Sequence, residues 1–426
     1  MFRYIVVPVG RGFCGVAVCS GTVLVTDCGV SLLGSGRVSR TSFRRACRNT
    51  ERYLSEALGF GGWRGVQWLI SHLHYDHYSL MAEYAIRRRL KVDTCYVSAA
   101  YSKAECVEAL AYIVAFQQLI YEIAGILPVR TLIPKILGDV CRDVKALKQG
   151  DTVELGGDVH LHVIWPEITI VTRYCGRVVE ALAKLVEEYC RSQERLSERG
   201  CMERFKAILG YVRESVNESL SRARLESPLE HEDASHSRDA DPQRGNERMK
   251  RTAVSTLIRK TTGTRGAFIV RKYREIVSRY ANATSVAYAI VVDNYTNRSI
   301  DLRIRESLPL TLAMLLSMPI DSNTLILYLA DLQNKNCVKV LDRALEYFLN
   351  NVVKLRRDPV QVSMVVAPHH GAGWSPLLKA LRPRITVISS DRLNGPALTN
   401  VKRFCSISPI VVTTGFEIAV EIASLG

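Results

Sequence analysis

Short apolar runs rich in β-branched residues recur towards both ends of the chain, and each is bounded by Gly, Pro or Asp. The first half contains "GTVLVTDCG" (21–29) and "VQWLIS" (66–71), and the second half contains "TLILYLAD" (324–331) and "SMVVAPHHG" (363–371). Runs of this length and composition predict strands. Segments with apolar residues at helical spacing lie between such runs, at 41–58, 78–90, 101–126, 336–350 and 375–382. This alternation predicts an α/β layered architecture.

The middle of the chain follows a different pattern. From 176 to 223, apolar residues recur at helical spacing among dense mixed charge, which predicts two long helices. The segment 226–251 is almost free of aliphatic and aromatic residues, so burial cannot offset the entropy lost on ordering, and we expect a flexible linker. A helical pattern then runs from about 253 to 280. The predicted parts are an α/β half at 1–166, a helical and partly flexible insertion at 167–280, and a second α/β half at 281–426.

Composition places the chain among ordinary globular proteins. Of its 426 residues, 47% are hydrophobic and 23% are charged, which is enough apolar material for a large core. Lys and Arg outnumber Asp and Glu by 57 to 42, giving a formal net charge of +15. A basic chain attracts polyanions, so nucleic acid is the expected partner, and a merely solvated basic surface is the alternative.

Three features bear on the cellular location. The first ten residues, "MFRYIVVPVG", read as a strand and not as an export signal. The twelve cysteines include no C-x-x-C pair, so we expect reduced thiols in a cytoplasmic protein, although disulfides inside a hyperthermophile cell stay open. The apolar stretch 109–129 carries Gln117, Gln118 and Glu122 in its middle, so we expect a buried helix and no stable membrane insertion.

One short segment concentrates metal-binding side chains. In "LISHLHYDHYSL" (69–80), three histidines and an aspartate occupy six consecutive positions of a chain with nine histidines. His72 and His74 alternate around Leu73 and can chelate one cation, whereas Asp76 and His77 turn towards a second. Imidazole and carboxylate donors without a thiolate suit zinc, manganese or iron.

Three further strand-like runs end in side chains of the same kind. Asp27 ends "VLVT", Asp331 ends "LILYLA", and His369 and His370 follow "SMVVAP". Ligands and catalytic groups collect at the carboxyl ends of strands in α/β folds, so we expect one shared site. Asp331 is then the bridging carboxylate between two cations, and His369 or His370 adds an imidazole to the second position. Asp27 is expected to accept a hydrogen bond that fixes the histidine loop.

Other histidines have simpler interpretations. An isolated H-x-H or H-H pair is more often a surface loop or a structural histidine than a metal site, and the combination of four strand ends is what favours metal here. His160 and His162 alternate within a strand, where a half-exposed face is the expected reason. His231 and His236 lie in the predicted linker. Cys28, although it follows Asp27, is expected to pack and not to ligate.

At this point the motifs resemble a known family. "SHLHYDH" resembles the H-x-H-x-D-H signature of the metallo-β-lactamase superfamily, and Asp27 and Asp331 stand where that family's other aspartates stand. "VVAPHHGAG" with "LRPRITVISS" resembles the ending of the ComEC-type subgroup of DNA-uptake proteins and their soluble relatives. "VHLHVIWP", and "NATSVAYAI" with Asn282 and Ser285, also resemble that subgroup. The resemblance covers about 1–165 and 281–415 and leaves out the insertion.

The resemblance implies an αββα sandwich, two mixed sheets between helical layers, interrupted here by the helical insertion. It also implies a metal site at one edge of the sheets, hydrolysis, and support of the ligands by Asn282 and Ser285. The chain departs from the pattern in two places. In many members of the family, a further histidine between the signature loop and the bridging aspartate completes the first metal position, whereas this chain has "NATS" (282–285) at that place, and "LNGP" (393–396) replaces the usual G-H-P.

Three functions are consistent with these features. The leading one is a metal-dependent hydrolase, a phosphodiesterase or nuclease that acts on DNA or RNA through a metal-bound hydroxide, with one or two zinc ions or with manganese. Its catalytic residues would be Asp76, His77 and Asp331. The second is a metallo-hydrolase of small thioesters or lactones. The third is a non-catalytic adaptor that binds a protein partner, or a second copy of itself, through 167–280.

Overall fold

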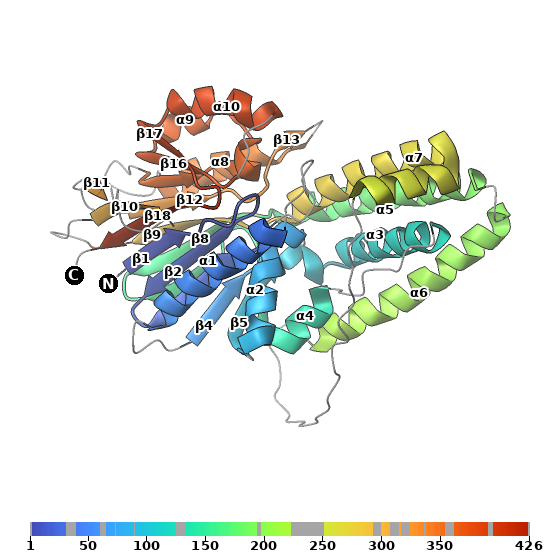
Figure 1. Cartoon of the computed structure of the whole chain (residues 1–426), viewed down its shortest axis with the longest axis horizontal. Helices are drawn as coiled ribbons and strands as arrows, with labels where there is room; N and C mark the ends of the chain where they lie inside the picture. Colours follow the sequence, from blue (N-terminus) through green and yellow to red (C-terminus); the bar gives the residue numbers. More distant parts are fainter. Residues whose placement is uncertain are drawn as a thin grey trace.

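The computed structural model describes residues 2–30, 40–59, 65–72, 74–88, 90–124, 133–193, 197–222, 251–292, 300–306, 315–316, 324–335, 338–353, 362–390 and 395–424. These residues form two large mixed sheets with helices around them (Figure 1). The predicted α/β class is therefore confirmed. The predicted linker at 226–251 lies outside the described residues, apart from Arg251, and so do His231 and His236.

The larger sheet has nine strands in the order β11-β10-β18-β1-β2-β3-β4-β5-β6. Its strands are β1 (Phe2–Val6), β2 (Cys14–Cys19), β3 (Thr22–Asp27), β4 (Gly65–Leu69), β5 (Val92–Ser98), β6 (Cys141–Leu147), β10 (Ile300–Glu306), β11 (Leu315–Leu316) and β18 (Ile418–Ser424). Strands β3 to β6 are parallel, and β1 pairs antiparallel with β18, which sets the two ends of the chain side by side (Figure 1). The first strand was predicted from the N-terminal sequence and is confirmed as β1.

The smaller sheet has seven strands in the order β17-β16-β15-β12-β9-β8-β7. Its strands are β7 (Thr152–Gly156), β8 (Val159–Trp165), β9 (Ala287–Val292), β12 (Thr324–Tyr328), β15 (Met364–Val366), β16 (Ile385–Ile388) and β17 (Ile410–Thr413). Strands β12, β15, β16 and β17 are parallel, so each sheet joins a parallel run to antiparallel strands. A two-stranded ribbon, β13 (Asn334–Lys335) with β14 (Val338–Lys339), lies apart from both sheets.

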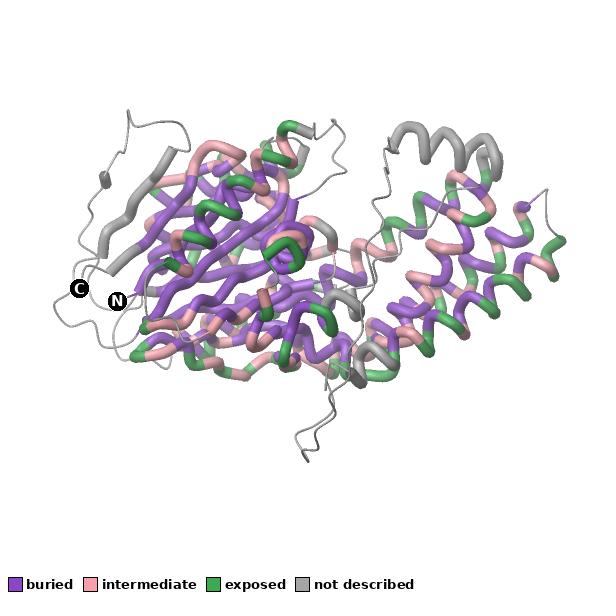
Figure 2. Tube along the Cα trace, turned by 60° about the horizontal axis from the view of Figure 1, so that its bottom comes forward, coloured by how far each residue is buried: buried purple, intermediate pink, exposed green. Residues whose placement is uncertain are grey.

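The two sheets pack face to face through a shared apolar layer. In β1, Phe2, Tyr4 and Val6 join this layer together with residues of β8, β9 and β12, whereas Ile5 belongs to the outer cluster. Because alternate side chains of a strand point to opposite faces, burial of every residue in β1 means that both faces of the sheet are covered. Figure 2 shows the buried strands as a continuous core.

Helices cover the outer faces of the two sheets. The nine-stranded sheet is covered by α1 (Arg40–Gly59), α2 (Tyr75–Arg88) and α4 (Ile133–Val140), and the seven-stranded sheet by α8 (Val340–Phe348), α9 (Leu378–Leu381) and α10 (Gly395–Cys405). Short helical turns complete the described elements: η1 (Ala99–Ser102), η2 (Leu349–Val353) and η3 (Pro368–Gly371). The order of layers is thus helices, sheet, sheet, helices (Figure 1).

Four helices form a separate lobe beside the sheets, here called the helical lobe: α3 (Ala104–Ile123), α5 (Ile168–Arg191), α6 (Glu198–Arg222) and α7 (Arg251–Thr284) (Figure 1). Phe116 of α3 packs edge-on against Tyr189 of α5 and Tyr273 of α7, with ring centroids 5.4 and 5.1 Å apart. The two long helices predicted at 176–223 are confirmed as α5 and α6. Since α3 also belongs to this lobe, the boundary at 166 stays a prediction.

Helix α3 is, among the described residues, the one helix long and apolar enough to cross a membrane. Nine of its residues are buried in the protein, which agrees with the predicted buried helix. Its tyrosine partners confirm the packing, because Tyr273 and Tyr280 of α7 donate hydrogen bonds of 2.8 Å to the Ile113 and Cys106 carbonyls. The alternating exposure of β8 likewise confirms the half-exposed positions of His160 and His162.

The expectation of reduced thiols is wrong for eight cysteines. Disulfides join Cys14 to Cys28, Cys95 to Cys141, Cys106 to Cys175, and Cys190 to Cys201. The partners are 11 to 69 residues apart and meet only when strands pair and helices pack, so spacing along the sequence does not reveal them. The cytoplasmic location stays a prediction.

Candidate metal centre

The ends of four parallel strands meet at one edge of the two sheets. Asp27 is the last residue of β3, and His72 follows the neighbouring strand β4. In the facing sheet, Asp331 follows β12 and His369 follows the neighbouring strand β15. Because neighbouring parallel strands end at the same edge, and the two sheets face each other, these side chains converge. The sequence prediction of a common site rests on the same logic, and the structure brings the residues together.

Seven side chains form this cluster, here called the His–Asp centre: His72, His74, Asp76, His77, Asp331, His369 and His370. Asp76 and His77 lie in the first turn of α2, where the amide dipoles favour a carboxylate. The segment that follows β3 lies close against this turn, because a Cβ atom on Gly29 would lie 2.4 Å from the Asp76 carbonyl carbon. Glycine at 29 is therefore required for the close approach.

Backbone strain accumulates around the centre. Asp27, Ala330, His369 and His370 all have positive φ, at 56°, 46°, 49° and 51°. A non-glycine residue in this region costs about 1–3 kcal/mol and persists only when its surroundings hold it. Two such contacts are the hydrogen bonds from the His369 amide to the Ala330 carbonyl, 2.8 Å, and from His370 Nδ1 to the Ser389 carbonyl, 3.0 Å. Strain of this kind is typical of functional sites.

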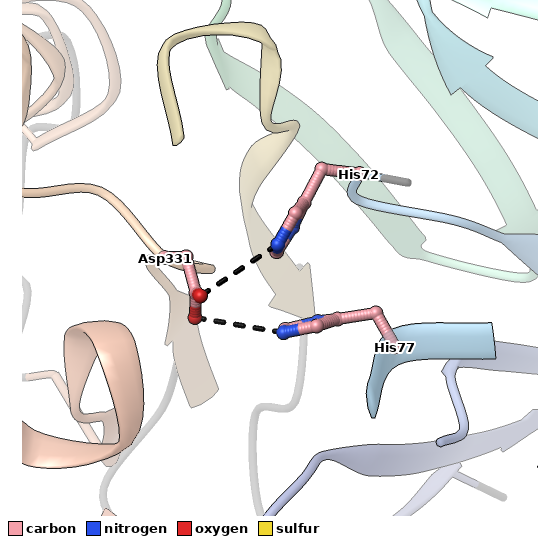
Figure 3. A group of neighbouring side chains, drawn as sticks. All are labelled: His72, His77 and Asp331. Carbon is pink, nitrogen blue, oxygen red and sulfur yellow. Dashed lines mark ion pairs between the residues drawn. The ribbon is translucent and has the colours of Figure 1, made fainter. Parts of the chain in front are cut away.

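The carboxylate of Asp331 divides the centre into two sets. Its Oδ2 atom lies 3.6 Å from His72 Nε2 and 3.6 Å from His369 Nδ1. Its Oδ1 atom lies 3.6 Å from His77 Nε2 and 3.9 Å from His370 Nε2. Figure 3 shows the His72 and His77 rings approaching the two oxygens from different directions. A carboxylate that bridges two cations needs one oxygen facing each of them, and the two oxygens of Asp331 are arranged in this way.

On the Oδ2 side, His72 and His74 point their ring nitrogens at each other. His72 Nε2 lies 3.0 Å from His74 Nδ1, so one cation could contact both rings, as the sequence predicts. His369 faces the same oxygen of Asp331. The sequence left the second position open between His369 and His370; in the structure His370 faces the second set and His369 faces the first.

On the Oδ1 side, Asp76, His77 and His370 bring one ligand atom each to within 4.8 Å of one another. A second group that meets the same criterion is His72, His77 and Asp331. The Nε2 atoms of His77 and His370 are buried and, among the described residues, have no hydrogen-bond partner. Buried polar atoms normally have a partner. These groups could therefore hold a metal ion, because a cation placed between them would satisfy both nitrogens.

Asp27 holds His77 in position. Its Oδ2 atom accepts hydrogen bonds from His77 Nδ1 at 2.8 Å and from Ser71 Oγ at 2.8 Å, and its Oδ1 atom accepts from the Ser71 amide at 2.6 Å. Tyr328 also donates its hydroxyl proton to Oδ2. The bond to Nδ1 fixes the tautomer of His77 and leaves Nε2 facing Asp331. This carboxylate–histidine pairing is typical of metal-ligating histidines.

Sequence reasoning missed three residues that support the centre. Ser71 precedes His72, Tyr328 is the last residue of β12, and Ser389 follows β16. Each occupies the end of a strand or the loop directly after it, the same position that identified the histidines. Ser and Tyr carry no metal signature, so only their place at a strand end could have revealed them.

The acidity of the cluster follows from its burial and charges. Burial lowers the pKa of His72 and His74, and the neighbouring His77 lowers that of His72 further, so both rings are neutral with lone pairs available. Burial opposes charge on His77 as well, but Asp27 and Asp331 outweigh it and raise its pKa to about 10. The surrounding histidines hold the pKa of Asp331 well below its usual range despite burial. The site therefore attracts positive charge, whether a proton or a metal ion.

Among the described residues, neither Asn282 nor Ser285 makes a side-chain hydrogen bond to a metal-binding side chain of the centre. Ser285 Oγ donates to the Ala281 carbonyl of the preceding helix α7 at 3.0 Å, and Asn282 Oδ1 is buried with no hydrogen-bond partner among the described residues. The link to the centre runs through the backbone, because the Val286 amide donates to the Ser71 carbonyl at 2.8 Å. The support that the resemblance implies for these two side chains is not seen as a hydrogen bond to a ligand.

No family model matches the chain, and no curated protein matches it. Among solved structures, the chain is similar to a crystal structure of a protein of unknown function from Enterococcus faecalis V583, with 11% sequence identity and a TM-score of 0.21. The similarity covers 38% of this chain and 37% of that chain. A likeness this weak carries no argument about fold or function.

Proposed function

We propose that the protein is a metal-dependent phosphodiesterase whose substrates are DNA or RNA, with zinc or manganese at the His–Asp centre. The observation that carries the proposal is the position of Asp331, whose two oxygens face two separate sets of imidazoles. Imidazole and carboxylate donors without thiolate suit these metals. Two cations bridged by a carboxylate are a common arrangement in enzymes that hydrolyse phosphate esters.

The metallo-β-lactamase sandwich is the finer fold assignment that goes with this proposal. Its support is the order of layers, with two mixed sheets packed face to face between helices, and the location of the centre at the carboxyl ends of β3, β4, β12 and β15. The motif "SHLHYDH" runs from the loop after β4 into the first turn of α2. The four-helix lobe is then an addition to that sandwich.

Bound cations would supply a Lewis acid that activates water and stabilises the charge developing on the phosphoryl oxygens. The chain's own residues prepare the site for them. Asp27 fixes the ring of His77, and the Ser389 carbonyl fixes that of His370. In the reaction, the water oxygen bonds to phosphorus, one ester P–O bond breaks, and the leaving oxygen takes up a proton.

The distribution of charge supports nucleic acid as the substrate class. Three carboxylates, Asp27, Asp76 and Asp331, are gathered at the centre, so without cations it would repel a phosphodiester. The chain as a whole has a formal net charge of +15, which favours polyanions through long-range attraction. Local repulsion and distant attraction are compatible when metal ions neutralise the centre. Hydrolysis should therefore depend fully on metal.

The experiment combines metal analysis with a hydrolysis screen. The purified chain is assayed for bound metal and for cleavage of labelled DNA, RNA and cyclic dinucleotides, alongside Asp331→Asn and the control Asp158→Asn, which removes an exposed carboxylate in the β7–β8 turn. We expect bound zinc or manganese, cleavage by the wild type and by the control, and loss of both properties in Asp331→Asn. Metal-loaded wild-type protein that cleaves none of these substrates would overturn the proposal.

A further inference from the structure

A pocket of about 400 Å³ opens beside the His–Asp centre, within the size range of small-ligand sites. The side chains that matter for its chemistry are Gln333, Trp374, Asn400 and Arg403. We call it the Trp374 pocket. None of these residues is a candidate metal ligand, so the pocket is distinct from the centre.

The wall of the Trp374 pocket continues directly from the metal-binding loops. Gln333 comes two residues after Asp331, and the pocket residue Ala372 comes two residues after His370. Asn400 Nδ2 donates hydrogen bonds of 3.1 Å to the carbonyls of Gly371 and Ala372, which ties helix α10 to the histidine loop. A ligand seated in the pocket would therefore extend from the place where the cations bind.

Gly373 keeps these two loops in contact. Its amide donates to the Pro368 carbonyl at 3.0 Å, and a Cβ atom at this position would lie 2.9 Å from the Leu332 carbonyl oxygen. The absence of a side chain therefore allows the loop after His370 to approach the loop after Asp331. The segments that follow Asp331 and His370 therefore connect the pocket to the centre.

Trp374 offers the pocket an aromatic ring in a fixed orientation. The ring is half-buried and meets Phe404 edge-on, with centroids 5.2 Å apart and an angle of 75°. The guanidinium carbon of Arg403 lies 5.7 Å from the centre of the Trp374 ring, and Arg403 also donates to Asn400 Oδ1 at 3.2 Å. An aromatic ring beside a guanidinium is the combination that binds a nucleobase by stacking and its phosphate by charge.

Gln333 contributes a buried acceptor. Its side chain lines the pocket although the residue is only 8% exposed, and its Oε1 atom has no hydrogen-bond partner among the described residues. A buried carbonyl oxygen without a partner is costly, so a ligand that donates a hydrogen bond here would be stabilised. The ring N–H and exocyclic amino groups of nucleobases are such donors.

We propose that the Trp374 pocket binds one nucleotide of the substrate, with its base against Trp374 and Gln333 and a phosphate near Arg403. This assignment rests on the proposed phosphodiesterase function and specifies it, because it places a base-binding subsite next to the bond that is cleaved. The pocket then separates nucleic acids from phosphodiesters that carry no base.

Equilibrium binding tests the subsite independently of turnover. Fluorescence anisotropy compares a labelled, cleavage-resistant tetranucleotide with the same backbone lacking its bases, using the wild type, Trp374→Ala, Gln333→Leu and Arg403→Ala. Lys402→Ala is the matched control, because it removes one exposed positive charge from the neighbouring position of α10 and does not line the pocket. The base-free backbone reports binding to phosphates alone.

We expect the wild type and Lys402→Ala to bind the intact tetranucleotide at least about tenfold more tightly than the base-free one, the effect of one stacked base. Trp374→Ala should abolish this preference, Gln333→Leu should reduce it, and Arg403→Ala should weaken binding of both ligands. Equal affinity of the wild type for both ligands, or an undiminished preference in Trp374→Ala, would overturn the assignment.

A second assay separates this outcome from failure of the proposed function. Bis(p-nitrophenyl) phosphate is a phosphodiester without a nucleobase, so its hydrolysis by the wild type reports on the His–Asp centre whether or not the pocket binds a base. Hydrolysis of this ester together with a missing base preference refutes the pocket and leaves the phosphodiesterase standing. A base preference without hydrolysis of any phosphodiester refutes the phosphodiesterase and leaves a nucleotide-binding pocket.

Discussion

The His–Asp centre and the helical lobe bury side chains of opposite kinds. The centre buries polar side chains, with His72, His77 and Asp331 each 3% exposed or less. The lobe buries aromatic and aliphatic side chains, such as Phe116 and Tyr189, and pairs its charges at the surface, as in Arg213 with Glu108. Burial of apolar side chains stabilises a fold. Buried charge and backbone strain lower its stability, and they are retained where a ligand or a function requires them.

The two regions should therefore respond to substitution in opposite ways. In the centre, losing a side chain should reduce activity and leave the fold intact. In the lobe, losing a side chain should reduce the free energy of unfolding and leave the activity of each folded molecule intact. Four predictions test that separation.

The largest effect is expected from His370→Ala. The substitution removes an imidazole from the set that faces Asp331 Oδ1, together with its bond to the Ser389 carbonyl, while the hydrogen bond from the His369 amide to the Ala330 carbonyl remains to hold the loop. We expect hydrolysis to fall about a thousandfold or more, equivalent to about 4 kcal/mol of transition-state stabilisation. His160→Ala, on the half-exposed face of β8, is the control and should keep full activity. Activity within tenfold of wild type in His370→Ala would remove this residue from the site.

Phe116→Ala tests the lobe. Phe116 is fully buried between Tyr189 and Tyr273, and truncating such a side chain leaves a cavity. We expect the free energy of unfolding, measured by denaturant titration, to fall by about 3–5 kcal/mol. Phe268→Ala, at a position 55% exposed, should change it by less than about 1 kcal/mol. A large loss of activity per folded molecule in Phe116→Ala would link the lobe to the chemistry.

A smaller loss of stability is expected when the Cys106–Cys175 disulfide is removed by alanine at both positions. This bond joins α3 to α5 inside the lobe and closes a long loop of chain. We expect a decrease of about 2–4 kcal/mol in the free energy of unfolding, with hydrolysis unchanged. Equal stability of the double variant and the wild type under oxidising conditions would show that the bond does not form in solution.

The smallest of these effects is expected from Asp27→Asn. Asparagine keeps the size of the side chain and tolerates the left-handed backbone at residue 27, but it accepts the His77 Nδ1 proton poorly. We expect metal affinity to fall by about 10–100-fold, the usual effect of losing the partner of a ligating histidine. Unchanged metal affinity would mean that His77 is not a ligand.

The parts of the fold that depend on local pattern could be predicted from the sequence. The β-branched runs that became β3, β4, β12 and β15 identify strands, and the polar residues that follow them identify a site at one edge. The prediction missed β6, "CRDVKAL", because only every third residue is buried and the charged residues between them resemble a loop.

Features that depend on tertiary contact could not be predicted. Cys14 meets Cys28 only because β2 pairs with β3, and α3 joins the lobe only because α5, α6 and α7 fold back onto it. The assignment of His369 to one oxygen of Asp331 and His370 to the other depends on the left-handed backbone at both histidines. The residue types in "APHHG" do not indicate a left-handed backbone at 369 and 370, because that conformation is most often adopted by glycine and both positions are histidines.

The central claim is that Asp331 lies between two cations held by histidines from both sheets. Anomalous scattering at the zinc edge, measured on a crystal grown with zinc, tests it directly. We expect two peaks, one beside each carboxylate oxygen of Asp331, the first in contact with His72 and His74 and the second with His77 and His370. A zinc-loaded crystal with no peak within coordination distance of Asp331 would contradict it.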